Sequence, residues 1–238
     1  MLIFPAIFLR NGRCHLQSEQ ISPRILAKEY ELLGASCLHV IDMDGARMGH
    51  LINEQALKEI LEEINIPIQV GGGIRSMQDV ERLLNIGAGK AIIGTKAVGN
   101  PAFIKDVITN FGKDKIIVSI DTIDGMIVTN GWEKASSVRA IDHAMEMKKL
   151  GVINISYVDA SRENHTSFNF IEEIHELYEK TGLHIITRGN RWSLKELEKL
   201  EEINVRGVVI EKDVFPGSMD IKSLIEIFNK GEADTYGR

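Results

Sequence analysis

The chain has 238 residues and a formal net charge of −6, with 26% charged and 44% hydrophobic residues. This length suits one large domain with a full core, and the acidic balance argues against a nucleic-acid-binding surface. No segment approaches the roughly 20 apolar residues of a membrane helix, and residues 1–8 lack the flanking signals of a secretory leader. The sequence therefore predicts a soluble cytoplasmic protein in which Cys14 and Cys37 are reduced, buried thiols.

Short apolar, β-branched runs alternate with amphipathic segments along the whole chain. Strands are predicted at 2–8, 37–42, 66–70, 90–94, 115–121, 152–158, 184–187 and 207–210. Helices are predicted at 23–33, 53–64, 77–86, 101–111, 138–150, 168–180, 194–202 and 219–229. This alternation predicts an α/β fold, a single (β/α)8 TIM barrel spanning residues 1–238. An open doubly wound sheet is the structural alternative, although its G-x-G-x-x-G fingerprint is missing.

An internal repeat supports the barrel. Adding 117 to each position lays residues 71–98 over residues 188–215 without a gap, so that Ser76 meets Ser193, and the same offset places Asp42 on Asp159. A slightly different offset lays "AIFLRNG" (6–12) over "SIDTIDG" (119–125). We therefore expect two half-barrels, at about 1–113 and 114–230, followed by a flexible polar tail at 231–238.

Glycine-rich turns after two consecutive strands suggest a phosphate site in the first half. Glycine lets an oxyanion approach the backbone, and a following helix start supplies N–H donors. The segments "GGGIRS" and "GT" therefore predict phosphate binding by Gly72, Gly73, Gly94 and Thr95. Tight turn geometry alone is the alternative explanation of these glycines.

The equivalent turns of the second half differ. Arg188-Gly189-Asn190 replaces the triple glycine, and Glu211-Lys212 replaces the second turn. A carboxylate at the position of Gly94 would exclude a phosphate, and we expect Arg188 or Arg191 to pair with Glu211. Alternatively, Arg188 and Lys212 bind an anion with their side chains.

The ends of the first and fifth strands also differ in chemistry. Asp121 ends the fifth strand, at the barrel face where catalytic residues gather. Its repeat partner is Phe8, which cannot transfer a proton. A carboxylate pair at these two positions would suit general acid–base catalysis, and here one member is absent.

Five segments identify a related family. "FPAI.L.NG.C", "LHVIDMDGA", "IPIQVGGGIRSMQDVERLL.IG", "IIGTKAV.NP" and "VTNGWEKAS" strongly resemble the HisA family. That family is the histidine-biosynthesis isomerase that converts an aminoaldose to an aminoketose, without metal or organic cofactor, on a (β/α)8 barrel with two phosphate sites. The resemblance covers essentially the whole chain and is most specific through about Lys134.

The sequence departs from the family where its chemistry is expected. The family's strand-one aspartate is Phe8, its strand-six threonine is Val158, and its general-acid aspartate is Glu163. The resemblance implies catalytic roles for Asp121 and Glu163. It also implies substrate-lining positions for Trp132, Arg162, His165 and Arg188.

Three possible functions follow. The first is a HisA-like isomerase whose activity is weakened by Phe8, Val158, Glu163 and Glu211. The alternatives are a repurposed barrel that binds a smaller single-phosphate ligand, or a non-catalytic partner protein. We expect the protein to bind no metal, cofactor, nucleic acid or membrane. We expect its ligand to be a small phosphorylated sugar-like molecule, and the protein to be a monomer or weak oligomer.

Three residues outside the phosphate turns have structural interpretations. We expect His39 to be a packed strand residue, His50 to belong to loop two, and Asp42 to order that loop by accepting backbone N–H bonds.

Overall fold

The computed structural model describes residues 1–15, 21–132, 134–160, 170–189, 192–211 and 220–229. The strands are β1 (Leu2–Arg10), β2 (Arg13–Cys14), β3 (Leu38–Asp42), β4 (Ile68–Gly71), β5 (Lys90–Ile93), β6 (Ile116–Ile123), β7 (Met126–Thr129), β8 (Lys134–Arg139), β9 (Asn154–Asp159), β10 (His184–Arg188) and β11 (Gly207–Ile210). The helices are α1 (Pro23–Leu32), α2 (Met43–Met48), α3 (Glu54–Glu63), α4 (Met77–Asn85), α5 (Thr95–Gly99), α6 (Pro101–Phe111), η1 (Lys113–Lys115), α7 (Ala140–Lys149), α8 (Phe170–Thr181), α9 (Leu194–Glu202) and α10 (Ile221–Phe228).

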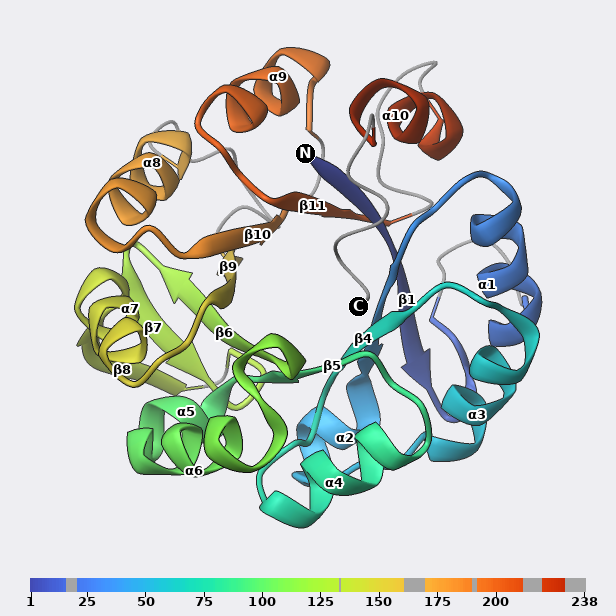
Figure 1. Ribbon diagram of the computed structural model, residues 1–238, viewed down its shortest axis with the longest axis horizontal. Helices are drawn as coiled ribbons and strands as arrows, with labels where there is room; N and C mark the ends of the chain where they lie inside the picture. Colours follow the sequence, from blue (N-terminus) through green and yellow to red (C-terminus); the bar gives the residue numbers. More distant parts are fainter. Residues whose placement is uncertain (16–20, 133, 161–169, 190–191, 212–219, 230–238) are drawn as a thin grey trace. The chain divides into compact units, whose positions relative to one another are not determined.

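The sheet confirms the predicted fold class. Across the described residues the strand order is β5-β4-β3-β1-β11-β10-β9-β6-β7-β8, and β5 also pairs with β6. Parallel registers join β1 to β3, β3 to β4, β6 to β9 and β9 to β10. Because β5 also pairs with β6, the sheet closes on itself, which an open doubly wound sheet does not do. The fold is therefore a (β/α)8 barrel (Figure 1). None of the described helices combines the length and apolar character needed to cross a membrane.

The chain divides into two compact units. Unit 1 comprises Met1–Ala91 and Val209–Arg238, and unit 2 comprises Ile92–Val208. This division falls at other points than the expected half-barrel boundaries, which remain a prediction. The expected flexible tail, 231–238, lies outside the described residues.

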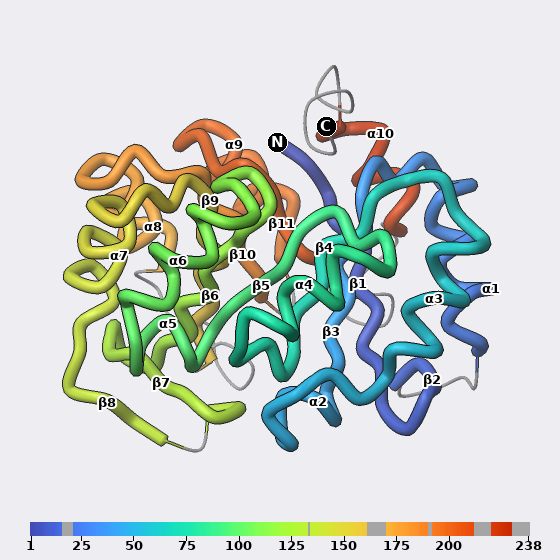
Figure 2. The backbone as a smooth tube through the Cα atoms, turned by 60° about the horizontal axis from the view of Figure 1, so that its bottom comes forward, coloured from blue at the N-terminus to red at the C-terminus, as the bar shows by residue number. Residues whose placement is uncertain are grey.

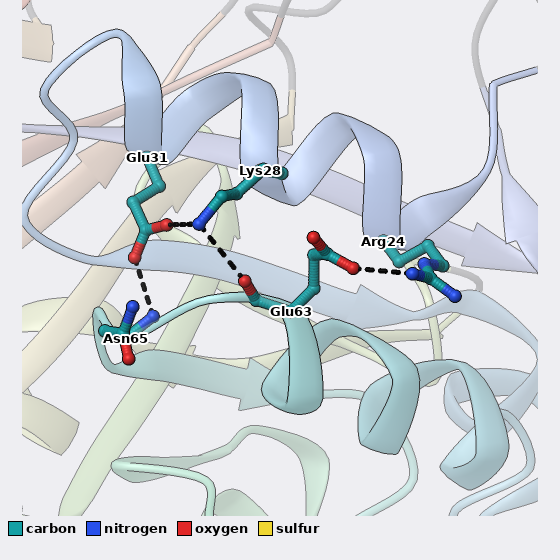
Figure 3. Close-up of polar contacts among 5 residues, drawn as sticks. All are labelled: Arg24, Lys28, Glu31, Glu63 and Asn65. Atoms are coloured by element: carbon teal, nitrogen blue, oxygen red, sulfur yellow. Dashed lines mark hydrogen bonds and ion pairs between the residues drawn. The ribbon is translucent and has the colours of Figure 1, made fainter.

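Unit 1 is built around strand β1, in which every residue except Phe8 and Arg10 is buried, and helices α1 and α10 lie against this strand. The Asn229 side-chain oxygen accepts a hydrogen bond from the Ile3 backbone N–H at 2.8 Å, which fixes the start of the strand. Helices α1 and α3 pack side by side, and Figure 3 shows their polar seam. Arg24 binds the Glu63 carboxylate at 2.7 Å, and Glu31 accepts from the Asn65 N–H at 2.6 Å.

Unit 2 carries an addition that the alternating pattern did not predict. The antiparallel strands β7 and β8 follow β6 and lie at the lower edge of the unit in Figure 2. Elsewhere in the unit, Tyr157 of β9 stacks on Phe170 of α8 with ring centroids 5.6 Å apart, and Trp192 lies 6.1 Å beyond Phe170. Trp192 is only 1% exposed, so this aromatic row forms part of the core under helix α8.

The internal repeat is visible in the helix caps. The Ser76 hydroxyl accepts from the Asp79 N–H, and the Asp79 carboxylate accepts from the Ser76 N–H, which makes a capping box at the start of α4. Ser193 and Glu196 make the same box at α9, and each lies 117 positions further along. The same two-residue device therefore starts both helices, as the aligned serines predict.

The repeat also places two hairpins that sequence reasoning missed. Asn11 and Gly12 have φ angles of 52° and 74°, and Asp124 and Gly125 have 51° and 72°. Positive φ at both central residues defines the type I′ turn that joins tight hairpins. The registers match as well: Leu9 pairs with Cys14 in the first hairpin, and Thr122 pairs with Ile127 in the second. The dipeptides Asn-Gly and Asp-Gly were the signals that could have predicted both turns.

Candidate active site

Asp121 is held by one donor on each carboxylate oxygen. It lies half-buried on β6, two residues after Ser119, so both side chains project from the same face of the strand. The Ser119 hydroxyl donates to Asp121 Oδ1 at 2.7 Å, and the Trp132 indole N–H donates to Oδ2 at 2.9 Å. A carboxylate has about four acceptor positions, so positions remain for a substrate proton.

Trp132 has an unusual backbone conformation. Its φ angle is +71°, which bulky L-residues rarely adopt. The preceding residues Asn130 and Gly131 are also in the left-handed region, and the Asn130 N–H donates to the Thr95 hydroxyl at 3.0 Å. The Arg188 guanidinium carbon lies 5.3 Å from the centre of the indole ring. A strained tryptophan whose ring bonds to a carboxylate and stacks on a cation indicates a functional position.

Unit 2 thus assembles several predicted site residues. Asp121, Trp132 and Arg188 are joined through the indole, and Thr95 anchors the turn that carries it. A Cβ atom at Gly94 would meet the Ser119 Cβ at 3.7 Å, so the start of α5 lies beside the same strand. The structure brings these residues from the start of α5, β6, β10 and the β7–β8 turn into one neighbourhood, which is the candidate active site of this unit.

In unit 1, the glycine-rich turn is packed against its own neighbours. Gly72 and Gly73 have φ angles of +104° and +81°. A Cβ at Gly72 would lie 2.1 Å from the carbonyl oxygen of Asp42, and one at Gly73 would lie 2.6 Å from the carbonyl oxygens of Gly45 and His50. These contacts explain both glycines by turn geometry and close backbone approach. Phosphate binding at this turn remains a prediction.

Loop two beside this turn is ordered by Asp42, as predicted. The fully buried carboxylate accepts from the backbone N–H groups of Gly45, Ile52 and Asn53 at 2.7–2.9 Å. The Asn53 side chain also donates to Asp44, whose pKa is lowered by that bond, and then by the Asn11 N–H, which donates at 2.6 Å. This network ties the β1–β2 turn to loop two.

The remaining predicted residues divide into two groups. Phe8 is half-buried on β1 and Val158 is buried at the end of β9, while Glu211 is half-buried after β11. Five further residues lie outside the described ranges: Arg162, Glu163, His165, Arg191 and Lys212. The expected pairing of Arg188 or Arg191 with Glu211 and the roles in loop six remain predictions.

His39 is a packed strand histidine as expected, 4% exposed with its ring 2.9 Å from the Gln69 amide. Within the described ranges, no group of three or more His, Cys, Asp or Glu could hold a metal ion.

Comparison with known proteins identifies the family. A family model described as "Histidine biosynthesis protein" matches residues 2–220. The chain belongs to the histidine biosynthesis protein family. It is 42% identical over 239 residues to a relative from Lachnoclostridium phytofermentans, with 97% of this chain and 100% of the relative covered. That relative is named an isomerase of 1-(5-phosphoribosyl)-5-((5-phosphoribosylamino)methylideneamino)imidazole-4-carboxamide.

Two further relatives with the same name support this membership of the histidine biosynthesis family. The protein from Syntrophomonas wolfei is 37% identical over 233 residues, with 93% of this chain and 96% of the relative covered. The protein from Acetivibrio thermocellus is 34% identical over 236 residues, with 95% and 99% covered. The resemblance inferred from the sequence motifs is thereby confirmed at the level of the family.

Proposed function

We propose that this protein is an aldose–ketose isomerase that acts on the doubly phosphoribosylated imidazole carboxamide named for its relatives. The observation that carries the proposal is the Asp121 site on a chain 42% identical to one such isomerase over its full length. Fold alone would not support it, because barrels host many reactions. A family-typical carboxylate on a barrel strand, held by two donors, links the fold to acid–base chemistry.

The isomerisation moves a proton between neighbouring carbons of an opened ribosyl group. The proton leaves the carbon that becomes the ketone and is returned to the carbon that bears the amine, so no oxidant or reductant is consumed. We assign the proton transfer to Asp121, whose carboxylate is oriented before substrate binds. Phe8 at the repeat-equivalent position offers no proton, and a single acid–base group costs about 10²–10⁴ in rate relative to a pair.

We assign phosphate recognition to the two glycine-rich turns, each within its own unit. At the unit 1 turn, the capping box already uses the N–H groups of Arg75 and Ser76, which donate to Asp79 at 3.0 and 2.8 Å. An anion there would therefore depend on the N–H groups of Gly72, Gly73 and Ile74. In unit 2, the equivalent role falls to Gly94 and Thr95. We also propose a cytoplasmic protein that acts on a small phosphorylated ligand as a monomer or weak oligomer.

A direct assay tests the proposal. Purified protein is mixed with the doubly phosphoribosylated substrate, and ketose formation is followed against the Lachnoclostridium phytofermentans relative. We expect turnover about 10²–10⁴ below that relative and none above background with Asp121→Asn, which serves as the control for contaminating isomerase. Wild-type turnover no higher than that of Asp121→Asn would refute the proposal. In that event, calorimetric binding of ribose 5-phosphate that Gly94→Glu abolishes would support the single-phosphate alternative.

A further inference from the structure

The two hairpins of the repeat also differ two residues before Phe8 and Asp121, on the same strand face. The offset that lays Phe8 over Asp121 lays Ala6 over Ser119. Ala6 is 2% exposed and has no side-chain donor, whereas Ser119 is half-buried and donates to the carboxylate at 2.7 Å. The hydroxyl is therefore present in the hairpin that has the carboxylate and absent in the hairpin that lacks it. The direct evidence that Ser119 acts on Asp121 is this 2.7 Å contact.

The local geometry makes the contact selective. Burial along β6 alternates, with Ile120 and Thr122 buried on one face and Ser119 and Asp121 half-buried on the other. Side chains two residues apart on a strand share a face, and the short serine reaches its neighbour's near oxygen. The far oxygen is taken by Trp132 at 2.9 Å. One donor from the strand and one from the turn thus determine the plane of the carboxylate.

The turn that supplies the second donor has a strained backbone, so it needs support. Trp132 has a φ angle of +71°, and such strain persists only where the surroundings hold it. The Arg188 guanidinium carbon lies 5.3 Å from the centre of the Trp132 ring, and the Asp121 carboxylate accepts a hydrogen bond from the indole N–H. If Asp121 were free to rotate about its own side-chain bonds, the indole would lose its partner. Ser119 therefore acts on the carboxylate directly and on the tryptophan through it.

We propose that Ser119 is a positioning residue for the isomerase reaction, which holds the Asp121 carboxylate in the orientation that takes the substrate proton and keeps Trp132 seated against it. The proposal rests on the proposed function. Orientation achieved before binding lowers the barrier of the chemical step without strengthening substrate binding. Loss of the hydroxyl should therefore lower kcat and leave KM almost unchanged.

Kinetics of three variants test the role. Ser119→Ala should lower kcat about tenfold with KM within about twofold, since a hydrogen bond to a charged group is worth roughly this factor. Ser119→Thr keeps the hydroxyl and should restore at least half of the wild-type kcat. The matched control is Ser156→Ala, because Ser156 is the register partner of Ser119 on β9, and its kcat should stay within about twofold. Unchanged kcat in Ser119→Ala, or no rescue by threonine in a protein of wild-type melting temperature, would overturn the proposal.

A spectroscopic measurement tests the same role without turnover. The chain has two tryptophans, and Trp192 is 1% exposed, so quenching by acrylamide reports mainly on Trp132. Ser119→Ala should raise the quenching constant of Trp132 toward that of Asp121→Ala, while Ser156→Ala should match wild type. Equal quenching in wild type and Ser119→Ala would contradict the positioning role. If the wild-type protein shows no turnover but quenching changes as expected, the proposed isomerase function is wrong, while the role of Ser119 in holding Trp132 against Asp121 is supported.

Discussion

The β1–β2 and β6–β7 hairpins have the same backbone and different chemistry. Both turn through two residues with φ angles between 51° and 74°, and their registers match position for position. On one strand face, the first hairpin has Ala6 and Phe8 where the second has Ser119 and Asp121. The backbone is thus preserved by its turn dipeptides and strand pairing. The serine and the carboxylate of the second hairpin are side chains that this shared backbone does not require.

The two hairpins are also anchored differently. In the first, the Asn11 N–H donates to Asp44 at 2.6 Å and the Gly12 N–H donates to Asn53 at 2.7 Å, both from loop two. In the second, the Gly125 carbonyl oxygen accepts from the Ala140 N–H at 3.0 Å, and Asp121 on β6 accepts from Trp132 of the β7–β8 turn. Both turns are therefore anchored to the following segments, and only the second strand has a carboxylate that accepts from an indole.

The largest expected effect separates the two faces directly. Asp121→Asn keeps the shape of the side chain and removes its ability to take a proton, so kcat should fall by about 10²–10⁴. Phe8→Leu at the repeat-equivalent position removes no acid–base group, so kcat should change by less than about threefold. Steady-state kinetics on both purified variants make the comparison. Similar losses in both would mean that the two faces contribute equally.

A smaller effect should follow from giving the first hairpin a carboxylate. Phe8→Asp places an acid–base group at the half-buried repeat partner of Asp121, and we expect kcat to rise about tenfold. Loss of apolar burial should cost about 1–2 kcal/mol of unfolding free energy, measured by urea denaturation. Phe8→Asn has nearly the same shape without the charge and is the control. A rise that Phe8→Asn reproduces would contradict the assignment.

The shared backbone predicts equal stability effects in the two turns. Gly12 and Gly125 have φ angles of 74° and 72°, and an added Cβ would find no atom within 4 Å at either. Gly12→Ala and Gly125→Ala should each lower the unfolding free energy by about 1 kcal/mol, because alanine is disfavoured in the left-handed region. Gly99→Ala, in helix α5 without positive φ, should be neutral or stabilising. A difference of more than about 1 kcal/mol between the losses of unfolding free energy in Gly12→Ala and Gly125→Ala would show that the two turns are not equivalent.

The smallest effect is a pH dependence confined to the first hairpin. Asn53 and the Asn11 N–H lower the pKa of Asp44 below its ordinary value of 3.8. A lowered folded pKa stabilises the protein above the unfolded pKa, and this contribution is lost as pH falls through the folded one. The protection factor of the Asn11 amide should therefore fall below about pH 3.8, while that of the Gly125 amide should not. Asp44→Ala should lower the protection of Asn11 already at neutral pH; unchanged protection there would remove Asp44 as the anchor.

Much of the fold followed from local sequence signals. Alternating apolar runs placed each barrel strand, and the serines at 76 and 193 marked the helix starts that the structure confirms as capping boxes. Such signals act within a few residues, so they can be read from the chain alone. The short hairpin strands were missed because β2 has two residues and β7 has four, too few to show a period.

The sequence alone predicted the barrel that the structure confirms, and it gave the repeat alignment that singles out Asp121 as a candidate catalytic carboxylate. Only the tertiary structure showed why Gly72 must be glycine, since the obstructing atom is a carbonyl oxygen of Asp42, 30 residues earlier. It alone also joined Ser119, Trp132 and Arg188 around Asp121, because their contacts depend on strand face, a left-handed turn and a stacking distance. Local composition decides which elements form, while the positions of donors around one carboxylate depend on how those elements pack.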